Sequence, residues 1–195
     1  MSYVVAHVIG VLFIYLVFAF PRWFFETTAV SISKSLDKGD YAAIVAKAKR
    51  LYRFVKIQTS ILSESEKCRH RADFCLVFLC VSFFAQKDYE NFQKHLRLIK
   101  EEKQSKEFWF TLSDLVVAED PISAKAHYQD YLALSPNYSP HYLTLIDALF
   151  LYTEGKTEEA RPMLEDAKKH IQLSVLKQVA CEYLLEYPSS KERNN

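Results

Sequence analysis

Tyr138–His170 reads YSPHYLTLIDALFLYTEGKTEEARPMLEDAKKH, and this stretch decides the fold. Its first part, Tyr142–Tyr152, has apolar residues three and four positions apart, the spacing of a helix buried on more than one side. Gly155 suits the left-handed backbone just past a helix end, and Thr157 is expected to cap the next helix with its hydroxyl, followed by an acidic first turn. The stretch therefore predicts two antiparallel helices joined by a tight turn.

The composition of the chain agrees with a helical protein. It has 195 residues, half of them hydrophobic, and a formal net charge of +1. This length suits one domain with a terminal extension, and the balanced charge gives no general reason to expect binding to nucleic acid. Only three Gly and six Pro occur, which disfavours an all-β fold with its many turns. We therefore expect an all-α fold with short connections.

The N-terminal stretch Tyr3–Phe20 contains no formally charged side chain and is followed by Pro21 and Arg22. Its 18 residues, as a helix, would cover about 27 Å, close to the hydrocarbon thickness of a bilayer. A signal peptide fits poorly, because no Lys or Arg precedes the apolar run and no cleavage motif follows it. A buried core helix is the remaining alternative. We expect residues 1–25 to form a transmembrane anchor.

The charges beside this anchor predict its orientation. No Lys or Arg precedes the apolar stretch, whereas Arg22, Lys34 and Lys38 follow it, and positively charged flanks stay on the cytoplasmic side. The four cysteines agree with a reducing compartment, although an even number would also permit disulfides. The sequence therefore predicts a single-pass protein with its N-terminus outside and its C-terminal domain in the cytoplasm.

The sequence upstream of the quoted stretch predicts three more helical pairs. Their arms are expected at 27–37 and 41–56, at 69–86 and 89–102, and at 108–118 and from 121 onward. A polar loop is expected at 57–66. The apolar run from Phe74 to Ala85, bounded by Asp73 and Lys87, is short for a membrane span and typical of a buried helix.

The spacing of these pairs is nearly regular. The second arms begin at Asp40, Asp88, Pro121 and Thr157, which are 48, 33 and 36 residues apart, so the first unit contains an insertion. The last three units resemble the tetratricopeptide repeat, a helix-turn-helix of about 34 residues. The positions that match its small, aromatic and proline residues are Ala124, Tyr128, Tyr131 and Pro136 in the third unit and Gly155, Ala160, Leu164 and Ala167 in the fourth.

This resemblance covers about Leu36–His170 and implies a stack of antiparallel helical hairpins. Tyr131 is larger than the pattern prefers, and Pro162 is expected to kink or shorten its helix. Leu173–Tyr187 is amphipathic and is expected to cap the stack. The predicted organisation is a transmembrane anchor at 1–25, a basic helical segment with a loop at 26–66, a repeat domain at 67–187 and a disordered tail at 188–195.

No motif of a known catalytic chemistry occurs in the sequence. The nearest constellation, Cys68, His70, Cys75 and Cys80, has a spacing unlike the common zinc patterns, and on one helix these side chains would diverge. The histidines fall on different predicted helices without an evident nucleophile. We therefore expect no catalytic residue, no cofactor and no metal ion.

In tetratricopeptide domains the first arm of each hairpin lines a concave groove. Carrying these positions over gives the candidate groove residues Phe74, Val77, Val81, Phe84, Trp109, Ser113, Val116, Tyr142, Leu145, Leu149 and Tyr152. The set lacks the basic and amide residues that hold an acidic C-terminal peptide, so an amphipathic helix of a protein partner is the better fit. Two alternatives are that these residues form the core, or that the terminal helix covers them.

A second candidate site is basic. Five basic residues and no acidic one lie between Tyr41 and Ser63, close to the predicted anchor. The candidate contacts with anionic lipid headgroups are Lys47, Lys49, Arg50, Arg53 and Lys56, each contributing about 1 kcal/mol near such a surface. An ordinary solvated helix face is the alternative.

These features predict a non-catalytic, membrane-anchored adaptor that binds a protein partner at the cytoplasmic face of a membrane. A structural or assembly subunit of a larger membrane complex is the alternative. No nucleic acid is expected as a partner.

Overall fold

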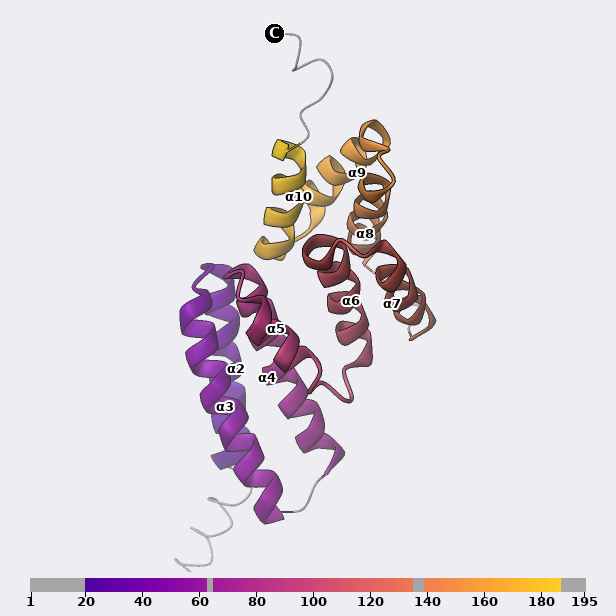
Figure 1. Ribbon diagram of the computed structural model, residues 1–195. Coiled ribbons are helices and arrows are strands. Elements are labelled where there is room, and N and C mark those ends of the chain that lie inside the picture. The colour runs from indigo at the N-terminus through magenta and orange to yellow at the C-terminus, as the bar shows by residue number, and fades with distance from the viewer. Residues whose placement is uncertain (1–19, 63–64, 135–138, 187–195) are drawn as a thin grey trace, which may run out of the picture.

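Helices make up the regular structure of residues 20–62, 65–134 and 139–186, the part of the chain that the computed structural model describes (Figure 1). In chain order they are α2 (Phe20–Asp37), α3 (Tyr41–Leu62), α4 (Glu66–Ala85), α5 (Tyr89–Leu96), α6 (Lys103–Ser113), the π-helical segment η2 (Asp114–Ala118), α7 (Pro121–Leu134), α8 (Pro140–Thr153), α9 (Thr157–His170) and α10 (Ser174–Glu186). No strand occurs in these residues, which confirms the predicted all-α class.

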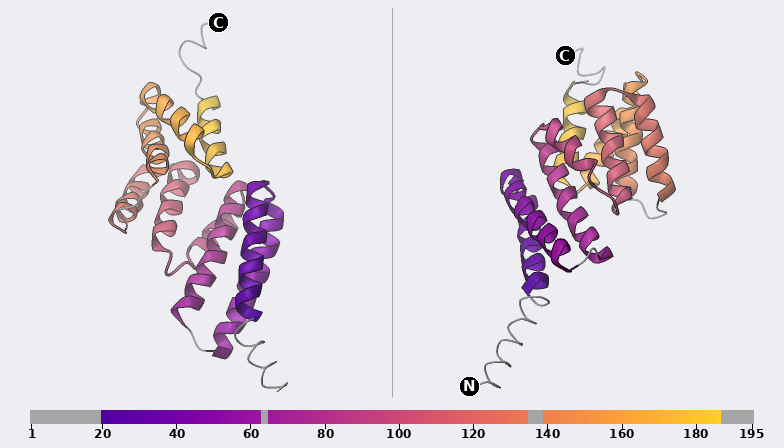
Figure 2. Two further views of the ribbon diagram at one scale, coloured as in Figure 1. Left: turned by 180° about the vertical axis from the view of Figure 1, so that it is seen from behind. Right: turned by 60° about the horizontal axis from the view of Figure 1, so that its bottom comes forward.

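The helices pack as the predicted pairs. α2 contacts α3, α4 contacts α5, α6 contacts α7 and α8 contacts α9, and α3 also packs along α4. Figure 2 shows these arms side by side from two further directions. The second arms begin within one residue of the positions expected from the sequence.

Three of the four hairpin turns have the same backbone structure. In each, an amide N–H donates to the carbonyl oxygen five residues earlier, and the residue before that amide has a positive φ. The donors are Asp40, Asp88 and Lys156, and the preceding residues are Gly39 (φ 67°), Lys87 (φ 58°) and Gly155 (φ 77°). This arrangement satisfies carbonyl groups that a helix end leaves unpaired.

The turn after η2 is a wider version of the same structure. The N–H of Asp120 donates to the carbonyl of Asp114, six residues earlier, and Glu119 has a φ of 51°. The additional residue is accommodated because the helix widens to π geometry before it ends.

Some helices end or begin away from the predicted positions. α6 begins at Lys103, five residues before the predicted start at 108. α3 continues to Leu62, through most of the expected loop, because the hydroxyls of Thr59 and Ser60 donate to carbonyls three or four residues earlier and so fit a helix. Ser65 then caps α4 by accepting from the N–H of Cys68. α5 ends at Leu96, six residues before the predicted end.

A buried carboxylate explains the early end of α5. Asp73 on α4 is only 3% exposed, and its Oδ2 accepts backbone N–H groups from Lys100, Glu101 and Glu102 at 2.8, 2.5 and 3.0 Å. These amides would bond to carbonyls within α5 if the helix continued. The hydrogen bonds from the amides of residues 100–102 to α4 therefore replace the last turn of the predicted helix and position the start of α6.

The start of α9 also differs in detail from the prediction. Thr157 is the first helical residue, and Lys156 precedes it as the cap without a side-chain hydrogen bond, so the predicted capping by Thr157 is wrong. Pro162 lies inside the helix but does not shorten it. The predicted small contact positions Ala160, Ala167 and, on α7, Ala124 are fully buried, as the hairpin packing requires.

The helix α10 joins the two ends of the described structure. It packs on α9, and its N-terminal end is directed toward the α2–α3 turn (Figure 1). The phenol oxygen of Tyr41 lies 2.6 Å from the hydroxyl oxygen of Ser174. Nζ of Lys87, in the α4–α5 turn, lies 3.1 Å from Oε1 of Glu182.

No helix in the described part of the chain is long and apolar enough to cross a membrane. The predicted transmembrane stretch Tyr3–Phe20 lies outside the described residues except for Phe20, and so do Pro136 and the predicted tail 188–195. The most apolar run of the described residues belongs to α4, where Leu76, Leu79 and Cys80 are buried in the core. The prediction of a buried helix at this position is confirmed.

Candidate functional site

A cavity of about 370 Å³ that is partly open to solvent lies among α2, α4, α6, α7, α8 and α10, and we call it the central cavity. Its walls come from helices that are distant in the sequence, because the first arms of the hairpins face the same interior and α10 closes one side. The lining residues are Leu36, Val77, Phe78, Val81, Gln104, Ser105, Phe108, Trp109, Tyr131, Ser139, Tyr142, Leu173 and Leu176.

Four candidate groove residues line this central cavity. Val77 and Val81 lie one turn apart on α4, Trp109 lies on α6 and Tyr142 on α8, so the three predicted first arms each contribute. Phe108 holds this wall together, because its ring lies 5.5 Å from that of Trp109 and 5.6 Å from that of Tyr142, measured between centroids.

The other candidate groove residues lie elsewhere. Five are buried but do not line the cavity: Phe84, Ser113, Leu145, Leu149 and Tyr152. Phe74 contacts the α2 residue Phe25, with 5.5 Å between ring centroids, and Val116 is half-buried on η2. For these residues the core interpretation fits better than the groove interpretation.

Several walls of the cavity were not predicted from the sequence. Leu36 lies in the last turn of α2, Leu173 directly precedes α10, and Leu176 lies in the first turn of α10. The alternative that the terminal helix covers the groove is therefore realised in part. The pattern of the first arms could not reveal these contributions, since they depend on the return of the chain from the last hairpin to the first.

Among the described residues, the lining of the central cavity contains no charged side chain. Its hydrogen-bonding groups are the amide of Gln104, the hydroxyls of Ser105 and Ser139, two phenols and the indole N–H of Trp109. Burial raises the pKa of Tyr142, so its phenol stays neutral. Such a lining favours apolar side chains or ligand groups and offers no counter-charge for a phosphate or a carboxylate.

A second surface lies at the N-terminal end of α2 and along α3. We call it the basic-aromatic patch and define it by Phe20, Trp23, Phe24, Lys49, Arg50, Arg53, Phe54 and Ile57, which, apart from Trp23, line one open hollow. Phe24 and Phe54 have ring centroids 4.7 Å apart, and the Arg50 guanidinium lies 5.7 Å from the centroid of Phe24. Trp23 and Ile57 remain 56% and 60% exposed.

The five predicted lipid contacts divide between this patch and other surroundings. Arg50 and Arg53 belong to the patch, and Lys49 lines it while its ammonium lies 5.3 Å from the Phe83 ring centroid. Lys56 faces Tyr52. The ammonium group of Lys47 donates to the Ser31 carbonyl and the Ser35 hydroxyl at 3.2 and 2.7 Å, which ties α3 to α2.

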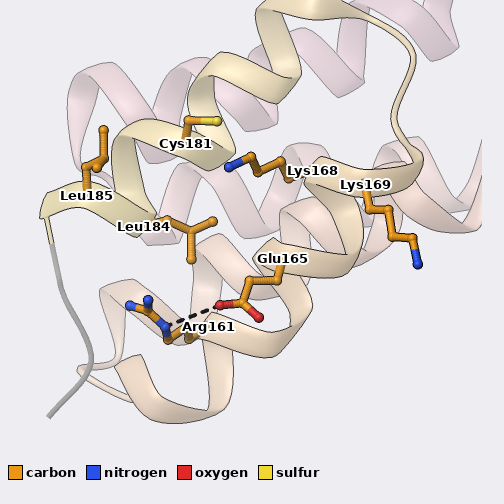
Figure 3. Close-up of a pocket in the computed structure, with 7 residues that line it drawn as sticks. All are labelled: Arg161, Glu165, Lys168, Lys169, Cys181, Leu184 and Leu185. Carbon is orange, nitrogen blue, oxygen red and sulfur yellow. Dashed lines mark ion pairs between the residues drawn. The ribbon is translucent and has the colours of Figure 1, made fainter. Parts of the chain in front are cut away.

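A third hollow lies between α9 and α10 (Figure 3). Arg161 and Glu165 approach to 3.4 Å at its edge, Lys168 extends toward Cys181, and Leu185 is 80% exposed. The hollow is open to solvent, and no described side chain in its lining is a buried polar group aimed into it. We therefore assign it no ligand.

The two most buried cysteines among the described residues are poor nucleophiles. Burial raises the pKa of both Cys75 and Cys80 to about 12, so their thiols stay protonated. His70 is near these cysteines in the sequence, but its Nδ1 atom lies 3.3 Å from Oε1 of Glu102. Two clusters of His and acidic groups in the described residues were not predicted from the sequence: His141, Asp166 and His170, and Glu107, His127 and Asp130.

No protein-family model, curated protein or solved structure matches this chain. The features that bear on the class of protein are therefore the helical fold, the central cavity and the basic-aromatic patch.

Proposed function

We propose that this protein is a non-catalytic helical-repeat adaptor, held at a membrane by its N-terminal stretch, that binds a protein partner through the central cavity. The repeat is of the tetratricopeptide type in this proposal. The shared turn structure at Gly39, Lys87 and Gly155 and the buried Ala124 and Ala160 support that assignment.

The central cavity is the observation that carries the proposal. It is uncharged, apolar and aromatic, and its volume of about 370 Å³ is near the lower end of the range of ligand pockets. A cavity of this kind accepts a few apolar side chains of a partner, while the partner's polar face stays in water. An amphipathic helix presents apolar side chains three and four residues apart in this way.

The membrane part of the proposal is supported by two neighbouring features. The uncharged stretch Tyr3–Phe20 directly precedes α2, and the basic-aromatic patch begins at the same end of that helix. Aromatic rings and basic side chains together suit the interface between headgroups and hydrocarbon. We propose that the helical domain lies on the cytoplasmic side with this patch against the lipid.

The non-catalytic part is supported by the chemistry of the cavity lining. The described lining has hydroxyl, amide and phenol groups but no carboxylate, imidazole or ammonium group, and burial raises the pKa of the Tyr142 phenol away from the range useful for a general base. The buried thiols of Cys75 and Cys80 are held in their unreactive protonated form.

The experiment is a comparison of three full-length chains recovered from native membranes in mild detergent. Ser105→Phe places a ring in the cavity, and Lys125→Phe adds the same ring at an exposed position on α7. We expect one stoichiometric partner with the wild type and with Lys125→Phe, and its loss with Ser105→Phe.

Two results would count against the adaptor. If no protein is recovered with the wild type, the proposal fails. If the same assembly is recovered at fixed stoichiometry with all three chains, the alternative of a structural subunit, held by surfaces other than the cavity, is favoured.

A further inference from the structure

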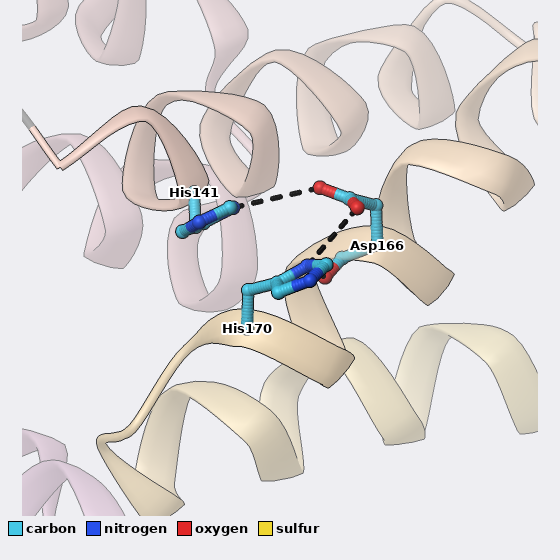
Figure 4. Close-up of side chains that lie close together, drawn as sticks. All are labelled: His141, Asp166 and His170. Atoms are coloured by element: carbon cyan, nitrogen blue, oxygen red, sulfur yellow. Dashed lines mark hydrogen bonds and ion pairs between the residues drawn. The ribbon is translucent and has the colours of Figure 1, made fainter.

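Three side chains of the fourth hairpin meet at its open end (Figure 4). His141 is the second residue of α8, while Asp166 and His170 lie one turn apart on the last part of α9. His141 and His170 are 14 and 15 residues from Gly155 on its two sides. An antiparallel hairpin that turns at this glycine therefore places them next to each other.

The geometry of this cluster is that of a set of ligands around one point. Nδ1 of His141 lies 3.5 Å from Oδ2 of Asp166, and Nδ1 of His170 lies 3.0 Å from Oδ1. The two imidazole rings are nearly parallel, at 17°, with centroids 4.6 Å apart. Each residue offers one ligand atom such that all three atoms lie within 4.8 Å of one another.

These distances match the spacing of ligands around a tetrahedral zinc ion. Zn–N and Zn–O bonds of about 2.0–2.2 Å place neighbouring ligand atoms about 3.3–3.5 Å apart. The two nitrogen–carboxylate distances in the cluster, 3.5 Å to Oδ2 and 3.0 Å to Oδ1, are close to that separation. Nδ1 of His170 also lies 3.0 Å from the backbone carbonyl oxygen of Asp166, so rotation of this ring would free a nitrogen for the third ligand position.

In the second cluster the ligand atoms of Glu107, His127 and Asp130 also lie within 4.8 Å of one another, but its one histidine is already held by carboxylates. Nδ1 of His127 lies only 2.6 Å from Oε2 of Glu107, the distance of a direct hydrogen bond, and its ring stacks on Phe110. The other ring nitrogen lies 3.8 Å from Oδ2 of Asp114. Two carboxylates thus engage the two ring nitrogens of His127, and this cluster offers one imidazole where the first offers two, which makes it a suitable control.

We propose that His141, Asp166 and His170 bind one divalent transition-metal cation of the zinc type. Two imidazoles with one carboxylate select such ions over Mg²⁺ and Ca²⁺, which prefer oxygen ligands alone. The side chains are 35%, 49% and 40% exposed, so water completes the coordination. The ion enters without rearrangement of the core.

Binding would link the two arms of the fourth hairpin at the end opposite its turn. His141 directly precedes Tyr142, and His170 is followed three residues later by Leu173, and both of these neighbours line the central cavity. The ion therefore fixes two segments of the cavity wall relative to each other. Because a protonated imidazole has no free lone pair, the affinity falls as the pH is lowered.

The experiment uses the tag-free full-length chain, stripped of metal by a chelator and kept in mild detergent. Zn²⁺ is titrated in competition with a chromophoric chelator, and the unfolding temperature is measured with and without Zn²⁺. We expect one ion per chain and a higher unfolding temperature with Zn²⁺ but not with Mg²⁺. His141→Gln, Asp166→Asn and His170→Gln should each weaken zinc binding by at least about tenfold.

Two control variants make the result specific. His127→Gln tests the other cluster, and Cys181→Ser tests binding by the half-buried thiol in the α9–α10 hollow. Both should bind Zn²⁺ as the wild type does. Wild-type affinity in the three ligand variants, or loss of binding in either control, would overturn the proposal. Without metal, the three ligand variants should unfold at the same temperature as the wild type, because the three side chains are partly exposed.

Discussion

The phenol oxygen of Tyr41 lies 2.6 Å from the hydroxyl oxygen of Ser174, although 133 residues separate them. This contact joins the first residue of α3 to the first residue of α10. It therefore holds the terminal helix where Leu173 and Leu176 can close one side of the central cavity. The accessibility of that cavity depends on how firmly α10 is attached.

The first prediction concerns this attachment. Tyr41→Phe removes the hydroxyl and should destabilise the docking of α10 by about 0.5–1.5 kcal/mol, the net value of a typical hydrogen bond. Hydrogen exchange of α10, followed by mass spectrometry, should become faster while exchange in α4 is unchanged. Tyr52→Phe removes a hydroxyl from α3 away from α10 and serves as the control. Equal exchange of α10 in all three proteins would show that the contact does not hold the helix.

The second prediction tests the packing of the third hairpin. Ala124 is fully buried on α7 at the contact with α6, so Ala124→Leu should force the arms apart and cost about 1–3 kcal/mol. Lys125→Leu adds apolar surface at the neighbouring exposed position and should change stability by less than about 0.5 kcal/mol. Thermal unfolding measures both. Equal melting temperatures would contradict the buried position of Ala124.

The hairpin boundaries could be predicted from the sequence because their determinants are local. Gly39 and Gly155 mark two turns directly, and Pro121 marks the first residue of α7. Lys87 and Glu119 adopt the same left-handed backbone without being glycine, so no glycine marks those two turns. The residues that follow them, with Pro121 as the clearest, and the regular spacing between units indicated the turns instead.

The end of α5 could not be predicted, since its cause is not local. The helical pattern of Phe92, Leu96 and Ile99 continues past the true end, and all three residues are buried. The determinant is Asp73, 27–29 residues earlier, which binds the amides that the helix would need. An aspartate in an apolar helix gives a hint of such a role but does not identify its partners.

The residues that line the central cavity could be predicted only in part from the sequence, for a similar reason. The helical period shows which residues of α4 are apolar, but α4 is apolar around most of its circumference, so the period does not separate Val77 from Phe84. That separation depends on α10, which approaches from the other end of the chain. The His141 and His170 pair, in contrast, could have been found from their similar distances to Gly155.

The third prediction concerns the buried carboxylate. Asp73→Ala leaves three amide donors without their acceptor and should destabilise the protein by about 3 kcal/mol or more, because hydrogen bonds to a charged acceptor are stronger than neutral ones. Asp37→Ala, at the exposed end of α2, should be within about 0.5 kcal/mol of the wild type. Urea unfolding compares them. A similar small effect for both variants would mean that the amides of 100–102 find other acceptors.

The fourth prediction exploits the left-handed turn residues. Glu119→Gly should stabilise the protein by about 0.5–1 kcal/mol, because a side chain at positive φ costs more than the additional entropy of glycine. Gly155→Ala should destabilise it by about 1–2 kcal/mol. No atom lies within 4 Å of a Cβ added at Gly155, so the cost would arise from the backbone alone. Thermal unfolding should show shifts of opposite sign, and shifts of the same sign would contradict the shared turn structure.

The last prediction concerns the basic-aromatic patch. A fragment of residues 20–195, without the apolar N-terminal stretch, should bind vesicles that contain anionic lipid weakly. Its affinity should fall as salt is added, because the screening length is about 8 Å at physiological ionic strength and shorter above it. Arg53→Gln should weaken binding about fivefold, corresponding to about 1 kcal/mol for each basic residue near the surface. Trp23→Ala should also weaken it, since the ring is 56% exposed beside the basic side chains.

The matched control for Arg53→Gln is Lys125→Gln, which removes one positive charge from the exposed face of α7, outside the patch. Sedimentation with vesicles of neutral and of anionic composition measures all four proteins. If the patch lies against lipid, the two patch variants lose affinity and Lys125→Gln does not. Equal binding to neutral vesicles, or equal losses for Arg53→Gln and Lys125→Gln, would show that net charge or apolar adsorption, and not this surface, accounts for the association.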